Sequence, residues 1–154
     1  MKDINKAIND LLQAHEAMLI NVRLLVLSID EIAPLAAKST LSDDEIKLIR
    51  ESLRNFGVAL FYMNEGEITH ENMDNDTLKS IISKDEQKDI NNEHTKIKAS
   101  IKQMQNELQN SDTWNAQQIN QHLVNLKKHI RDFHDFVFRH ATCENEMAKR
   151  GLTK

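Results

Sequence analysis

The chain has 154 residues, enough for one domain over 1–154 with a substantial hydrophobic core. Its 20 basic and 24 acidic side chains give a formal net charge of -4. The basic residues do not gather into a stripe that would follow phosphates, so we expect no nucleic-acid partner. No apolar run approaches the roughly 20 residues that span a bilayer, so we expect no membrane role.

Cysteine usage and the start of the chain favour a cytoplasmic protein. The single cysteine, Cys143, cannot form an internal disulfide. Charged residues interrupt the first 16 positions, MKDINKAINDLLQAHE, so this stretch does not have the apolar core of a signal peptide. Three glycines and one proline are few for 154 residues, while helix-favouring residues are plentiful. The composition therefore predicts an all-α fold.

Apolar residues at helical spacing define four segments along the chain. They run from Ile8 to Ile29, from Ile46 to Met63, from Ile90 to Leu108 and from Leu123 to Val137. With their flanks they predict four helices of roughly 25 to 35 residues.

The breaks between these segments carry start and stop signals for helices. Pro34 is expected to end the first helix, and Ser42 with Glu45 forms a capping-box pattern before the second. Ser83 with Glu86 repeats that pattern, and NSDT at 110–113 is expected to open the fourth helix. Short connections favour antiparallel neighbours, so the prediction is an up-down-up-down four-helix bundle.

The two halves of the chain show the same spacing of polar residues. His15 and His94 are 79 residues apart, and Glu65 and Glu144 are also 79 residues apart, as in a duplicated helical hairpin. Both histidines fall on the apolar stripe of their segment and are expected to point inward. His140 continues the apolar stripe of the last segment, and Glu144 lies one turn further on the same face.

Inward histidines and an inward carboxylate predict a metal site. A lone inward histidine is more often a hydrogen-bonded core residue than a ligand, but three of them with Glu144 shift the balance. In four-helix bundles, histidines and carboxylates from facing helices build carboxylate-bridged iron or manganese sites.

These motifs give the chain a resemblance to the hemerythrin-like (HHE cation-binding) family. LLQAHEAML carries His15, NNEHTKI carries His94, and RHATCENEM carries His140 and Glu144, in the order of that family over nearly the whole chain. The resemblance implies a four-helix bundle in which the first and third helices each give a histidine and the second and fourth each give HxxxE. It also implies non-haem iron, one or two ions.

The second segment departs from this pattern, because LRNFGVALFYMNEGEITHENM has no histidine at the expected place. Two registers compete: Glu65 with Phe61 in place of the histidine, or Glu67 with Met63 in its place. The apolar stripe favours Glu67. The predicted metal ligands are therefore His15, Glu67, His94, His140 and Glu144.

By this resemblance, one metal position has two histidine ligands and the other has only one. His94 and His140 would serve the first position, whereas His15 alone would serve the second. Tyr62, a water or His70 could complete it, or the chain could bind one ion or none. His70 is expected at an exposed helix end, because THENMDND is polar almost throughout.

The resemblance implies a non-haem iron protein that binds or senses oxygen, nitric oxide or peroxide, or that handles iron, more a binding protein than an enzyme. One alternative is a metal-free helical bundle that docks a protein partner. Another is a zinc-binding regulatory bundle, because the segment FGVALFYMNEG resembles a phrase found in such bundles. Such bundles have a cysteine just before that phrase, where this chain has Arg54 and Asn55. The oligomeric state stays open.

Overall fold

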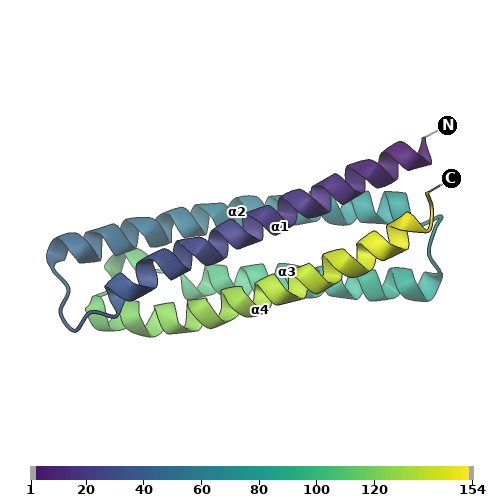
Figure 1. Ribbon diagram of the computed structural model, residues 1–154. Coiled ribbons are helices and arrows are strands. Elements are labelled where there is room, and N and C mark those ends of the chain that lie inside the picture. The colour runs from purple at the N-terminus through teal and green to yellow at the C-terminus, as the bar shows by residue number, and fades with distance from the viewer. Residues whose placement is uncertain (1–2, 153–154) are drawn as a thin grey trace.

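The computed structural model describes residues 3–152 and forms a bundle of long antiparallel helices (Figure 1). The helices are α1 (Ile4–Ala36), α2 (Asp43–Leu78), α3 (Lys84–Glu107) and α4 (Ala116–Lys149), with a 3₁₀ turn η1 (Ser111–Thr113) before α4. The predicted all-α, four-helix architecture is confirmed. Both ends of the chain and the α2–α3 connection lie at the same end of the bundle (Figure 1). Within the described range, no helix is long and apolar enough to cross a membrane.

The predicted capping boxes begin two of the helices. The Glu45 amide donates to Ser42 Oγ over 3.1 Å, and the Ser42 amide donates to Glu45 Oε1 over 3.0 Å. Ser83 and Glu86 make the same reciprocal pair at the start of α3. Each box satisfies two amides that have no partner inside the helix.

Two helix boundaries differ from the prediction. α1 runs through Pro34 and ends at Ala36, because the Ala37 amide donates to the Ala33 carbonyl and closes the last turn despite the proline. The NSDT segment forms the connection and not the start of α4. Asn110 adopts the left-handed conformation (φ 64°), which asparagine tolerates. Asn115 then caps α4.

A layer of buried polar side chains divides the core into two apolar clusters. The larger cluster, which includes Leu53 and Phe133, lies toward the α1–α2 connection. The smaller cluster lies at the end with the chain termini and consists of Ile8, Leu11, Leu78, Ile90 and Ala148. The polar layer between them contains His15, Glu67, His70, Asp74, His94, His140 and Glu144. Burying so many ionisable groups is costly unless they pair with one another or with a cation.

Candidate metal centre

Every helix of the bundle supplies a histidine to this layer. His15 and His94 lie about three turns into α1 and α3, and His70 and His140 lie about two turns before the ends of α2 and α4. Because the helices are antiparallel, these positions fall at one level of the bundle. None of the four imidazoles is more than 6% exposed. Asp74 and Glu144, one turn beyond the histidines of α2 and α4, are fully buried.

Asp74 lies among three of the histidines. Its Oδ1 is 3.2 Å from His15 Nε2, and its Oδ2 is 2.6 Å from His94 Nε2 and 3.3 Å from His70 Nε2. One carboxylate from α2 thus reaches imidazoles on α1, α2 and α3.

Glu144 lies opposite and reaches all four histidines. Its Oε2 is 3.2 Å from His15 Nε2 and 4.0 Å from His70 Nε2. Its Oε1 is 3.4 Å from His94 Nε2 and also contacts His140 Nε2. One oxygen therefore faces the histidines of α1 and α2, and the other faces those of α3 and α4.

Within residues 3–152, these six side chains form two groups that could each hold a metal ion. The α1–α2 position consists of His15, His70, Asp74 and Glu144. The α3–α4 position consists of Asp74, His94, His140 and Glu144. In each group the ligand atoms lie within 4.8 Å of one another, and both carboxylates belong to both groups. Imidazole with carboxylate suits iron, manganese and zinc.

Several polar atoms of the centre have no hydrogen-bond partner among the described residues. They are both oxygens of Glu144, Nε2 of His140 and both nitrogens of His70. Some of these atoms lie at ion-pair distance from one another, but they make no hydrogen bond among the described residues. Buried polar atoms without such bonds are rare and costly. His70, His140 and Glu144 belong to the two groups that could hold a metal, so a cation in each group could satisfy atoms of these residues.

Three of the histidines are oriented by hydrogen bonds from their outer nitrogens. In each case Nδ1–H donates to a side-chain oxygen on another helix, which turns Nε2 toward the centre. The pairs are His15 with Asn145, His94 with Glu67 and His140 with Glu93. Support of this kind fixes the tautomer that a metal-ligating histidine needs.

The pKa values show how the metal-free centre balances its charge. Burial disfavours the imidazolium form, but contacts with Asp74 and Glu144 outweigh it and raise the pKa of His15 to about 10 and of His94 to about 12. Burial and the charge of His15 lower the pKa of His70 to about 3. Burial raises the pKa of Asp74 to about 6, whereas contacts with the histidines outweigh burial and lower the pKa of Glu144. At neutral pH, protons on His15 and His94 thus supply the positive charge that a cation would bring.

The structure brings four of the predicted ligands together: His15, His94, His140 and Glu144. Glu67 is buried, at 2% exposed, and Glu65 is exposed, as the apolar stripe predicts. Glu67, however, lies outside both groups that could hold a metal and accepts a hydrogen bond from His94 instead.

The expectation that His70 lies at an exposed helix end is wrong. His70 is 6% exposed and, with Asp74, gives α2 a histidine and a carboxylate in a group that could hold a metal. The spacing held a signal: Phe56, Leu60, Met63, Glu67, His70 and Asp74 recur at intervals of three or four residues along one face of α2. The pair His70 and Asp74 also repeats the four-residue spacing of His140 and Glu144.

Comparisons with family models, with curated proteins and with solved structures found no significant match. The interpretation of this centre therefore rests on the residues themselves and on their geometry.

Proposed function

We propose that the protein is a hemerythrin-like bundle that holds a pair of non-haem iron ions and binds or senses a small molecule such as oxygen, nitric oxide or peroxide. The observation that carries this proposal is the sharing of two buried carboxylates, Asp74 and Glu144, between two pairs of histidines. Carboxylates placed in this way can bridge two cations and offset part of their charge. The corrected second-helix pair also strengthens the resemblance to HHE proteins, with Asp74 where the motif has glutamate.

In this proposal His15 and His70 hold one ion, His94 and His140 hold the other, and the two carboxylates serve both. Iron held there would supply open coordination positions and one-electron redox chemistry to a small ligand. The chain itself supplies a buried site, because apolar clusters lie on both sides of the polar layer. A small uncharged ligand can enter such a site more readily than a charged one, which favours binding or sensing of a gas or peroxide.

Metal content tests the proposal directly. Protein from iron-supplemented cultures, measured by plasma mass spectrometry, should carry about two irons per chain if both groups are filled. His94→Ala and His140→Ala should each lower that content. His129→Ala is the matched control, because His129 lies on α4 outside both groups. Stoichiometric zinc would favour the zinc-binding bundle instead. A folded protein without metal would sink the proposal and favour a bundle that docks a protein partner.

The hydrogen bond behind His140 gives a second prediction. Glu93→Gln should weaken metal binding by about 10- to 100-fold, because a neutral amide accepts the His140 Nδ1–H bond less strongly than a carboxylate. Competition with a chromophoric chelator measures the change. Glu146→Gln removes an exposed charge from α4, the helix that carries His140, and should leave the affinity unchanged. Equal affinities in the two variants would show that Glu93 does not support the centre.

A further inference from the structure

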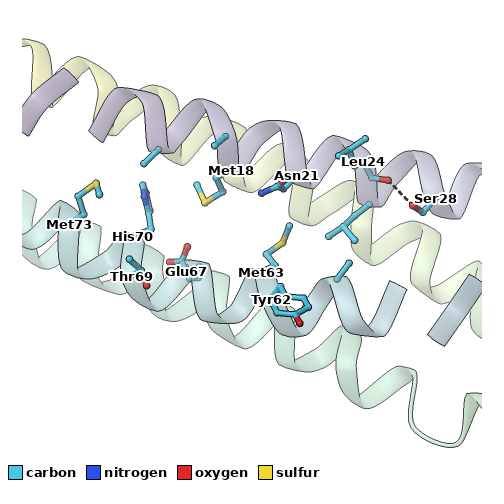
Figure 2. Close-up of a pocket in the computed structure, with 15 residues that line it drawn as sticks. Met18, Asn21, Leu24, Ser28, Tyr62, Met63, Glu67, Thr69, His70 and Met73 are labelled. Carbon is cyan, nitrogen blue, oxygen red and sulfur yellow. Dashed lines mark hydrogen bonds between the residues drawn. The ribbon is translucent and has the colours of Figure 1, made fainter. Parts of the chain in front are cut away.

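A groove between α1 and α2 runs up to the metal centre. Its volume is about 550 Å³. Figure 2 shows its walls, with Met18 reaching down from α1 and Met63 and Met73 reaching up from α2. Alanines and Gly66 complete much of the lining, so the walls are largely apolar. His70, a member of the α1–α2 position, is part of the same wall.

Two residues of the lining, Glu67 and His70, each have a polar atom that is unsatisfied. Glu67 Oε2 and His70 Nδ1 are buried and have no hydrogen-bond partner within the described part of the chain. The two residues are three apart on α2, so they share a face of the helix. Figure 2 shows both side chains directed from α2 into the space below α1. The groove therefore combines a largely apolar lining with a pair of unsatisfied polar atoms on neighbouring residues, the arrangement of a ligand pocket.

The size of the groove indicates an organic ligand. Pockets for organic ligands typically enclose about 300–1,000 Å³, whereas a diatomic gas needs only a small fraction of that space. Methionine side chains are flexible and adapt to unbranched chains. A groove of 550 Å³ with three methionines thus fits a linear apolar molecule better than a gas alone.

The two polar atoms, Glu67 Oε2 and His70 Nδ1, determine which polar group of a ligand can bind beside them. His94 already donates to Glu67 Oε1, which leaves Oε2 as a free acceptor. If His70 Nε2 faces a metal, as in the proposed function, Nδ1 carries the proton and is a donor. A hydroxyl group can donate to the first atom and accept from the second. An ammonium group cannot accept, and the charge of Glu67 repels a carboxylate.

We propose that the groove between α1 and α2 binds a linear primary alcohol, with its hydroxyl at Glu67 and His70 and its chain along Met18 and Met63. The choice of head group rests on the proposed metal function, whereas the apolar part of the site does not. A ligand held there touches His70 through the nitrogen opposite the one that faces the centre. Binding of a ligand in the groove therefore directly affects His70, which belongs to the α1–α2 position.

Gly66 offers a way to block the groove without disturbing the fold. It lines the groove, and a Cβ atom built at this position has nothing within 4 Å. Gly66→Leu should fill the space that the alcohol chain occupies. Gly66→Ala is the matched control, because it also removes a glycine from the helix but adds only one methyl group. Both variants should fold at least as well as the parent chain.

The probe is 1-octanol, titrated into metal-loaded protein that carries ¹³C-methyl methionine. We expect saturable shifts of the Met18, Met63 and Met73 methyl signals in the parent and in Gly66→Ala. Binding should be at least about tenfold weaker in Gly66→Leu, where the side chain takes the place of the ligand. Octanoate should bind about tenfold more weakly than octanol, because it places a second negative charge beside Glu67.

The proposal is overturned if octanol causes no saturable shift, if Gly66→Leu binds it as well as Gly66→Ala does, or if octanoate binds as tightly. Metal content measured on the same samples separates this result from the proposed function. Metal with no octanol binding would remove the groove ligand and leave the metal centre standing. Octanol binding in a chain that takes up no metal would support the groove and contradict the iron proposal.

Discussion

Glu144→Gln is expected to empty both metal positions. Glu144 reaches the imidazoles of α1 and α2 with one oxygen and those of α3 and α4 with the other. The amide has nearly the same shape but only one oxygen and no negative charge, so at least one cation loses a ligand atom and both lose part of their charge balance. Affinity should fall at both positions by at least about 100-fold, more than for loss of a supporting hydrogen bond. Plasma mass spectrometry of the purified variant measures the content.

The neighbouring Glu146 provides the matched control. It is exposed on the same helix two residues further on, so Glu146→Gln changes the net charge equally without touching the centre. His70→Leu adds a contrast, because it removes a ligand of the α1–α2 position alone and should leave the other ion bound. If Glu144→Gln kept the parent affinity at either position, the carboxylate would not be shared, and the two-ion proposal would fail. Circular dichroism should show that all three variants stay helical.

The fold was predictable because helix formation and burial both leave local signals. Apolar residues at three- and four-residue intervals mark the buried face of each helix, and the capping boxes at Ser42 and Ser83 mark where two helices begin. The same periodicity placed His15, His94 and His140 inward, and all three are buried. These signals depend on neighbours within two turns, so they are readable from the sequence alone.

The pair His70 and Asp74 was not predicted, because the polar stretch THENMDND indicated an exposed helix end and the spacing of the two halves did not point to His70. In the bundle, 55 residues separate His15 from His70, but only 46 separate His94 from His140. The second hairpin is shorter because α3 has 24 residues, whereas α1 has 33. Ligands must meet at one level of the bundle, and any hairpin length that returns the chain to that level will serve. Ligands at one level of the bundle therefore need not be separated by the same number of residues in the two halves of the chain.

The supporting acceptors could not have been predicted from the sequence. Asn145, Glu67 and Glu93 each accept a hydrogen bond from a histidine on a different helix. Those contacts depend on how far each helix is rotated about its axis and how closely it packs on its neighbour. Heptad-like spacing indicates which face is buried but leaves that rotation undefined by some tens of degrees.

Removing the metal at pH 7 is expected to lower the midpoint of thermal unfolding by about 8–16 °C. Metal at about 1,000 times its dissociation constant stabilises the folded state by about 4 kcal/mol, and each kcal/mol shifts the midpoint of a chain this size by about 2–4 °C. Without metal, the layer keeps six buried ionisable ligands, and several of their polar atoms have no hydrogen-bond partner among the described residues. Differential scanning calorimetry before and after treatment with a chelator measures the shift.

The shift should grow between pH 7 and pH 9. In the metal-free protein, contacts with the carboxylates raise the pKa of His15 to about 10 and of His94 to about 12, although burial opposes this, whereas unfolded imidazole titrates near 6.5. The folded state thus binds more protons than the unfolded state in this range, and its free energy of unfolding falls as pH rises. His70, with a pKa of about 3, and Asp74, with a pKa of about 6, have already lost their protons.

The metal-loaded protein should respond to pH much less over the same range, because its ligating histidines are already deprotonated. Glu144→Gln is the control for the chelator. This variant should hold no metal, so treatment with the chelator should leave its unfolding midpoint unchanged. A metal-free protein that became more stable from pH 7 to pH 9 would contradict the protonated pair His15 and His94. Asp74 and Glu144 are buried carboxylates, so each needs positive charge beside it. In the metal-free protein the protonated histidines supply that charge, and in the metal-loaded protein the cations supply it.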